Sequence, residues 1–205
     1  MTKYPNIETA TLLWIESLKG VVATQKEFIR DYIFHTSGIA ITAQKIAEKA
    51  GLNPEKAYVL GLLHDWGKIQ REKETGISHV FVGYSKMMEL GYDAVARVCL
   101  THSFPIKDFD EKNYPAYSKK DLSFAKQFLS QTQYDDYDKL IQLCDIFFES
   151  TRRVSPQYRL KKIRERYGLD ESQTRELELG AKQNKEYFDK LCGCDVFEIV
   201  NLDIL

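Results

Sequence analysis

A histidine and an aspartate stand side by side after an apolar run, in the segment GLLHDWGK at residues 61–68. Titratable side chains are costly to bury unless something pairs with them. Neutral imidazoles and carboxylates together form a ligand set for divalent transition metals. Because adjacent residues on an α-helix point about 100° apart, His64 and Asp65 need not bind a metal ion in the same way. Asp65 could bridge two ions through its two oxygens while His64 binds one of them.

The remaining histidines also fall on predicted helices or at their ends. The four histidines of the chain are His35, His64, His79 and His102. A further carboxylate, Asp145, interrupts the apolar run LIQLCDIFF, where an unpaired buried charge would be expensive. Antiparallel neighbouring helices could bring such positions together, as metal sites in the core of a helical bundle require.

The elements that must position these residues are helices. Apolar residues recur at helical spacing, and capping residues such as Asn53 before Pro54 and Ser155 before Pro156 mark helix starts. We predict an all-α protein with helices at about residues 9–18, 26–50, 54–66, 79–90, 94–102, 119–129, 135–152, 156–167 and 171–191. The prolines and charges of 105–117 predict a surface loop, and the tail from residue 195 is left unassigned.

Length and composition limit the possible classes of protein. The 205 residues suit one domain, for which we expect a core at about 26–165 and C-terminal helices at 166–205. With 43% apolar and 29% charged residues the chain resembles an ordinary soluble protein. A net charge of -1 gives no global field for nucleic acid or acidic lipid, so we expect neither partner. No apolar run approaches the roughly 20 residues of a membrane span, and no signal peptide is evident.

The four cysteines favour a reducing cytoplasm. Cys99, Cys144, Cys192 and Cys194 form neither a CxxC pair nor a dense disulfide framework. The pair Cys192-Gly-Cys194 is compatible with a metal or redox role, or with inert thiols near a chain end, and the sequence leaves its role open.

The order His35, then His64-Asp65, then Asp145 resembles the HD-domain superfamily of metal-dependent phosphohydrolases. In that superfamily these four residues bind a catalytic metal within an all-helical core. The segment HVFVGYSKMMELGYDAVARVCLTHS is similar to the part of dinuclear members that carries two further histidines. The segment LIQLCDIFFESTRRV resembles the region around the final aspartate in bacterial HD-class hydrolases that split diadenosine tetraphosphate symmetrically. The resemblance covers about residues 26–165, but the long stretch at 105–136 departs from it and could reshape the pocket.

The resemblance implies a set of site residues. The metal ligands would be His35, His64, Asp65, His79, His102 and Asp145. They would hold one or two divalent ions, and these ligand types suit iron, manganese, cobalt, nickel or zinc. Asp65 and Lys68 would be catalytic, with Lys68 contacting phosphate. Arg152 and Arg153, about two helical turns after Asp145, are either further phosphate contacts or a solvated helix end.

These residues predict a reaction class. We expect hydrolysis of a phosphoester or phosphoanhydride in a small phosphorylated molecule, a nucleotide or dinucleoside polyphosphate, by water that the metal activates. Such chemistry needs no serine or cysteine nucleophile. The alternatives are an HD-type module that senses a nucleotide without cleaving it, and a structural protein whose polar residues pair among themselves. The segment 61–68 is not a phosphate-binding Walker loop, because five residues separate its glycines and Ile69 follows Lys68.

Overall fold

The computed structural model describes residues 3–19, 26–70 and 78–200, which form an almost entirely helical protein and confirm the predicted all-α class. The helices are α1 (Ile7–Ser17), α2 (Lys26–Lys49), α3 (Pro54–Leu63), α4 (Gly67–Gln70), α5 (His79–Glu89), α6 (Asp93–Thr101), the 3-10 helix η2 (Glu111–Asn113), α7 (Lys119–Ser130), α8 (Asp136–Asp145), α9 (Pro156–Tyr167), α10 (Arg175–Cys192) and α11 (Val196–Val200). Strand β1 (Phe148–Glu149) pairs antiparallel with β2 (Arg152–Arg153). Helix α11 lies in the tail that the sequence pattern left unassigned, of which residues 201–205 fall outside the described part.

Local capping signals set several helix ends where the sequence predicts them. The side chain of Asn53 accepts a hydrogen bond from the backbone N–H of Lys56 at 3.0 Å, directly before α3. Ser155 caps α9 in the same way, accepting from the N–H of Tyr158 at 3.2 Å. Gly168 closes α9 with φ of 66°, a left-handed conformation that glycine adopts without strain. These helix ends are therefore determined by neighbouring residues.

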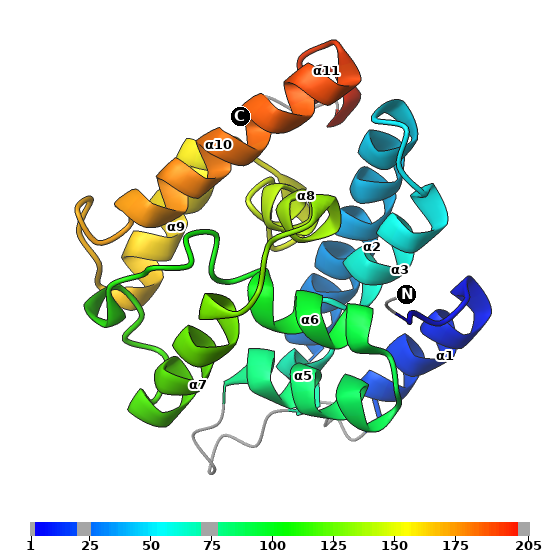
Figure 1. Cartoon of the computed structure of the whole chain (residues 1–205), viewed down its shortest axis with the longest axis horizontal. Helices are drawn as coiled ribbons and strands as arrows, with labels where there is room; N and C mark the ends of the chain where they lie inside the picture. The colour runs from blue at the N-terminus through cyan, green and yellow to red at the C-terminus, as the bar shows by residue number, and fades with distance from the viewer. Residues whose placement is uncertain (1–2, 20–25, 71–77, 201–205) are drawn as a thin grey trace.

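Helix α8 lies at the centre of the molecule and packs against α2, α3, α6 and α10 (Figure 1). Its apolar residues belong to the larger hydrophobic core, where Leu140 and Leu143 are fully buried. A second, smaller core holds the 105–136 segment in place through Phe104, Phe109 and Leu129. No helix in the described segments is long and apolar enough to cross a lipid bilayer.

Close contact between α2 and α3 depends on a glycine. A Cβ added at Gly61 would lie 2.9 Å from the Cα of Ala40, which is too close for any side chain. The helices α2 and α3 therefore cross at backbone contact. This crossing holds the C-terminal end of α3, and the residues that follow it, directly against α2.

Two predicted helices end earlier than expected. The helix predicted at 135–152 is wrong beyond Asp145, because α8 ends there and the chain turns into the β1–β2 hairpin, with Ser150 at φ of 55°. The helix predicted at 54–66 ends at Leu63, and a turn leads to the short α4. Tertiary packing overrides helical spacing at the first of these ends, since the ring of Phe148 packs so closely on α2 that a Cβ at Gly38 would lie 2.4 Å from its Cε1.

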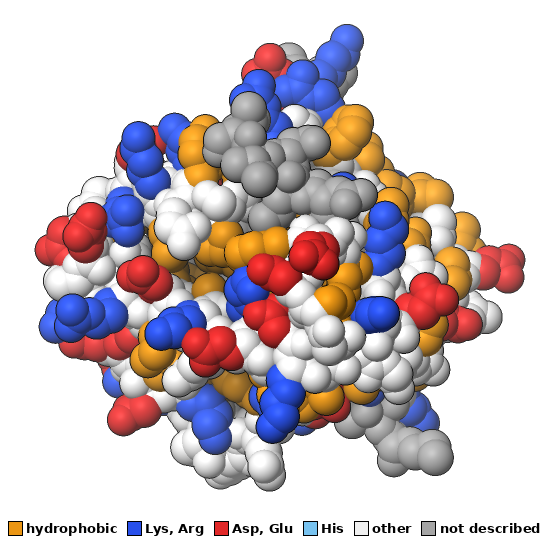
Figure 2. Space-filling view, turned by 90° about the horizontal axis from the view of Figure 1, so that it is seen from above, with side chains coloured by type: hydrophobic (Ala, Val, Ile, Leu, Met, Phe, Trp, Pro, Cys, Tyr) orange, Lys and Arg blue, Asp and Glu red, His pale blue; other side chains and the backbone are white. Residues whose placement is uncertain are grey.

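The surface seen from above in Figure 2 mixes charges of both signs. Lysine and arginine side chains lie close to aspartate and glutamate side chains, with apolar side chains between them. In its described part this face therefore carries no extended field of one sign, as expected for a chain of net charge -1.

A partly buried ion pair joins α6 to α8. The Nε of Arg97 lies 3.0 Å and 2.8 Å from the two carboxylate oxygens of Asp138, which also accepts a hydrogen bond from Thr101 at 2.8 Å. Asp138 is fully buried, and this burial raises the pKa of its carboxyl. The pair holds the end of α6, and hence the following His102, against α8.

We expect Arg97→Met to lower the free energy of unfolding by about 3 kcal/mol, because it leaves the Asp138 carboxylate buried without its cation. Urea denaturation of the full chain would measure the loss. The matched control is Lys86→Met, which removes the exposed pair with Glu89 and should cost below about 0.5 kcal/mol. Equal losses in the two variants would contradict the structural role of the Arg97 pair.

Candidate metal centre

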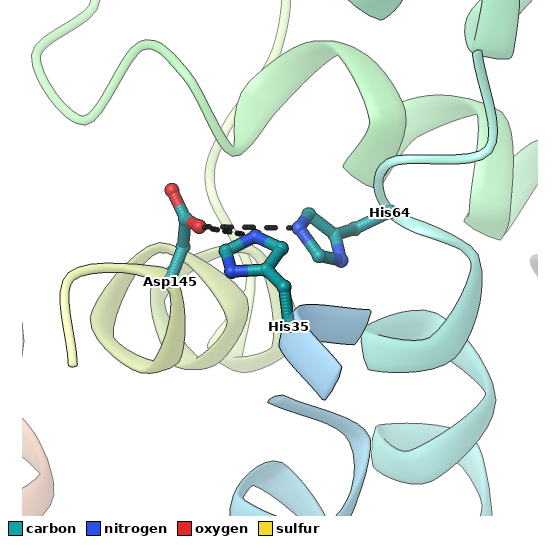
Figure 3. Close-up of side chains that lie close together, drawn as sticks. All are labelled: His35, His64 and Asp145. Carbon is teal, nitrogen blue, oxygen red and sulfur yellow. Dashed lines mark ion pairs between the residues drawn. The ribbon is translucent and has the colours of Figure 1, made fainter. Parts of the chain in front are cut away.

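Six residues from distant parts of the chain converge on one point. They are His35 in α2, His64 and Asp65 in the turn after α3, His79 at the start of α5, His102 directly after α6, and Asp145 at the end of α8. Figure 3 shows three of them, His35, His64 and Asp145, whose side chains point toward one another from separate elements. The structure thus brings together every residue that the sequence analysis proposed as a metal ligand.

One oxygen of Asp65 faces the first half of this cluster. Its Oδ2 lies 3.3 Å from Nε2 of His35 and 3.5 Å from Nε2 of His64. The Oδ1 of Asp145 lies 3.1 Å and 4.0 Å from the same two nitrogens. The ligand atoms of His35, His64 and Asp145 all lie within 4.8 Å of one another, and two imidazoles with a carboxylate are a ligand set for a divalent transition metal.

The other oxygen of Asp65 faces the second half. Its Oδ1 lies 3.3 Å from Nε2 of His79 and 3.6 Å from Nε2 of His102. The carboxylate of Asp65 thus stands between two pairs of histidines and turns one oxygen to each pair. Among the described residues, the ligand atoms of His64, Asp65 and His102 also lie within 4.8 Å of one another, and His79 contacts the same Asp65 oxygen from outside that group.

Backbone carbonyls orient two of the imidazole rings. Nδ1 of His64 lies 2.7 Å from the carbonyl oxygen of Gly61, and Nδ1 of His102 lies 3.1 Å from that of Val98. An imidazole that donates its Nδ1 proton to a carbonyl presents the Nε2 lone pair to a metal. The Nε2 atoms of His35 and His64 and the Oδ1 of Asp65 are buried and make no hydrogen bond within the described structure. A metal ion bound among these atoms would supply the partner that each of them lacks.

The protonation states of the cluster also suit a metal. Burial lowers the pKa of His64 and of His79, and burial together with the nearby His64 lowers the pKa of His102 to about 4. Burial alone would raise the pKa of Asp65, but the ammonium of Lys68 and the adjacent His64 hold it well below its usual value. At neutral pH these three imidazoles are therefore neutral and Asp65 is ionised, as metal ligands must be.

A cavity of about 500 Å³ opens over the cluster. Lys68 lines it, with Nζ 2.6 Å from Oδ2 of Asp65 and the side chain about one third exposed. Residues 113–117 line it as well, so part of the 105–136 segment forms a wall of the pocket. A concave space of this size is typical of a small-molecule site.

The structure separates Arg152 and Arg153 from this cavity. Both lie on β2 and neither lines the cavity; Arg152 is exposed, and Arg153 donates to the carbonyl oxygen of Val200 at 3.0 Å. The physical reason is the end of α8 at Asp145, after which no helix carries the two arginines along the site.

Two other arginines, Arg159 and Arg166 of α9, line the cavity instead. Arg159 is buried, forms an ion pair with Glu149, and places Nη2 4.0 Å from Oδ1 of Asp145. The sequence analysis missed both arginines. Their seven-residue spacing, which places two side chains on one face of a helix, was the available signal.

The thiols of Cys192 and Cys194 lie apart from this chemistry. Cys192 is buried near the carbonyl oxygen of Ile46, and neither cysteine belongs to a potential metal-holding group found among the described residues.

Comparisons with known proteins agree with this geometry. Residues 32–148 match the family model described as "HD domain". The chain is 36% identical over 78 residues to ribonuclease Y of Mesoplasma florum, an alignment that covers 38% of this chain and 15% of that protein. The chain thus spans only a small part of the length of this curated relative. No solved structure matches the chain.

Proposed function

Because the chain belongs to the HD domain family, a superfamily of metal-dependent phosphohydrolases, we propose that it hydrolyses a phosphoester or phosphoanhydride bond of a nucleotide or dinucleoside polyphosphate. The observation that carries the proposal is the position of Asp65, which turns one oxygen to His35 and His64 and the other to His79 and His102. The similarity to bacterial hydrolases of diadenosine tetraphosphate remains a prediction within this proposal.

The metal-binding residues would be the six of the cluster, and they would hold one or two divalent transition metal ions. A metal bound there would act as a Lewis acid toward a phosphoryl oxygen and supply an activated water. The role of Asp65 would be to bind metal through its carboxylate, which lies between His35 and His64 on one side and His79 and His102 on the other. The role of Lys68 is to place its ammonium beside Asp65, where it can contact a phosphate oxygen.

We assign the second phosphate contact to Arg159 in place of Arg152 and Arg153. Arg159 lines the cavity, and its Nη2 lies 4.0 Å from Oδ1 of Asp145. A guanidinium presents its N–H donors in a planar fork that matches the oxygens of a phosphate.

The charges of the cavity explain why binding of phosphate should depend on metal. Four carboxylates and three permanent cations line it. The carboxylates are Asp31, Asp65, Asp145 and Glu149, and the cations are Lys68, Arg159 and Arg166. The lining alone is therefore slightly negative and would repel a phosphate, whereas the metal-loaded site would attract it.

Two alternatives are favoured less. The name of the ribonuclease Y relative suggests RNA as a substrate, but a cavity with a wall at residues 113–117 fits a small molecule better than a long polymer. A nucleotide-sensing module without catalysis would not need both histidine pairs around Asp65. One experiment distinguishes the three hypotheses: a nucleotide hydrolase, a ribonuclease and a nucleotide-sensing module.

The experiment uses the tag-free chain, reconstituted separately with iron, manganese, cobalt, nickel and zinc. Nucleoside mono-, di- and triphosphates, diadenosine tetraphosphate, an RNA oligonucleotide and bis(p-nitrophenyl) phosphate serve as substrates. We expect turnover of a nucleotide that a chelator abolishes and added metal restores. Metal-dependent nucleotide binding without turnover of any substrate would identify a sensing module, and preferential cleavage of the oligonucleotide would identify a nuclease. Absence of bound metal after reconstitution would contradict the proposal outright.

We place this activity in the cytoplasm. All four cysteines are free, and Cys99, Cys144 and Cys192 are buried thiols. Free thiols persist most readily in a reducing compartment.

A further inference from the structure

The cations of the cavity pair away from the half of the cluster that contains His79 and His102. Lys68 pairs with Oδ2 of Asp65, and the two arginines that line the cavity pair with Glu149. Within the described ranges no lysine or arginine pairs with Oδ1 of Asp65, the oxygen that faces His79 and His102. Hydrogen bonds from the protein to a phosphate on this side would therefore come in part from neutral groups.

Ser103 places a hydroxyl group at this half of the cluster. The residue directly follows His102, is partly exposed and lines the cavity. Its Oγ lies 3.1 Å from Nε2 of His102, and Nδ1 of the same ring lies 3.1 Å from the carbonyl oxygen of Val98. Because an imidazole that donates through Nδ1 accepts at Nε2, the Ser103 hydroxyl donates its proton to His102.

The hydroxyl of Ser103 must change its partner when His102 binds metal. The Nε2 lone pair can bind a metal ion or accept from Ser103, but it cannot do both. The Ser103 proton then needs another acceptor, because a hydrogen-bond donor left without a partner away from water is costly. Since Ser103 lines the cavity, a phosphate oxygen in the cavity can be that acceptor.

Tyr117 of the 105–136 segment also lines the cavity, and its ring is held in place by aromatic packing. Its ring centroid lies 5.5 Å from that of Phe104 and 6.0 Å from that of Tyr114, both of which belong to the smaller hydrophobic core. Such packing restricts the ring, so the hydroxyl that it carries has a defined position before any ligand binds.

The hydroxyl of Tyr117 lies close to the same half of the cluster. Burial raises the pKa of this hydroxyl, while the side chains of Ser103 and Ser78 act against the rise as hydrogen-bond partners. Ser78 directly precedes His79, and Ser103 directly follows His102. The hydroxyl thus lies beside the neighbours of both histidines, and it keeps its proton at neutral pH, so it is available as a donor.

We propose that the hydroxyls of Ser103 and Tyr117 form a phosphate-binding pair, which donates hydrogen bonds to a phosphoryl oxygen in the half of the cluster that contains His79 and His102. The pair complements Lys68, whose ammonium lies at the other oxygen of Asp65. Tyr117 belongs to the segment that departs from the family resemblance, so the proposal gives this segment a role in binding. The inference rests on the proposed function for the presence of a phosphoryl group in the cavity.

Calorimetric titration of inorganic phosphate into the metal-loaded full chain tests the pair without requiring turnover. Ser103→Ala and Tyr117→Phe should each weaken phosphate binding about tenfold, because each removes one hydrogen bond to a charged group. Ser103→Thr keeps the hydroxyl and should bind phosphate within about threefold of the wild type. Ser130→Ala and Tyr158→Phe are the matched controls, since both residues are exposed and lie outside the cavity, and they should leave the affinity unchanged.

Elemental analysis and thermal unfolding of each variant provide the second readout. Metal content should stay at the wild-type level in Ser103→Ala and Tyr117→Phe, because the proposal makes neither hydroxyl a metal ligand. Loss of metal in parallel with loss of phosphate binding would show that the two residues only position His102, and would overturn the phosphate contact. Unchanged phosphate affinity in both variants would overturn it as well.

The outcomes separate the inference from the proposed function. Hydrolysis of bis(p-nitrophenyl) phosphate by the wild-type chain tests the function, whereas binding of inorganic phosphate tests the pair. A chain that hydrolyses this compound but binds phosphate equally well without the two hydroxyls would overturn the pair and leave the function standing. Phosphate binding that depends on both hydroxyls would support the pair even if no compound is hydrolysed, in which case only the proposed hydrolase fails.

Discussion

Asp65→Asn is expected to remove most bound metal and to reduce hydrolysis by about a thousandfold or more. The substitution keeps the shape of the side chain but removes the negative charge that faces all four histidines. An amide cannot hold two cations at its two ends, and it leaves Lys68 without its partner at 2.6 Å. Loss of metal activation is worth several kcal/mol in the transition state, which corresponds to a rate effect of this size.

Elemental analysis of the purified variant would be combined with a turnover assay on the best substrate of the wild-type chain. Asp189→Asn is the control, because Asp189 lies on α10 outside the cavity and pairs with Lys185. This control should keep full metal content and activity. Retention of metal and turnover by Asp65→Asn would refute the central role of the carboxylate.

The double variant His79→Ala plus His102→Ala should lose one of two metal equivalents and at least about a hundredfold in kcat. The two histidines face Oδ1 of Asp65, whereas His35 and His64 face Oδ2. Removing one pair leaves the other pair with Asp65 and Asp145 to hold a single ion. Replacing His35 and His64 instead should remove the ion that Asp145 also contacts.

Elemental analysis of the wild type and of both double variants measures the stoichiometry directly. Two equivalents that fall to one would establish a dinuclear site and favour dinucleoside polyphosphates as substrates. One equivalent in the wild type, unchanged by loss of His79 and His102, would show a mononuclear site and favour nucleoside monophosphates. Circular dichroism would verify that the helices survive, since His79 and His102 lie at the ends of α5 and α6.

Local sequence determined the elements and the types of the reactive residues. Helical spacing and caps such as Asn53 and Ser155 predicted most helices, because caps and amphipathic faces act within a few residues. The adjacent His64 and Asp65 indicated a metal for the same reason: a titratable pair after a buried run needs a partner wherever the chain folds. Membership of the HD domain family, expected from the order of these residues, is confirmed.

Only the tertiary structure determined which side chains lie together at the metal centre and in the cavity. His35 and Asp145 are far apart in the chain, yet Nε2 and Oδ1 lie 3.1 Å apart because α2 and α8 pack together. The end of α8 depends on Phe148 packing against Gly38, a contact that helical spacing cannot reveal. That contact turns Arg152 and Arg153 away and leaves Arg159 of the next helix in the cavity. Such positions follow from long-range packing, in which burial of large side chains outweighs local helical preference. The sequence pattern alone therefore predicted the metal-binding residue types but not which other side chains line the cavity.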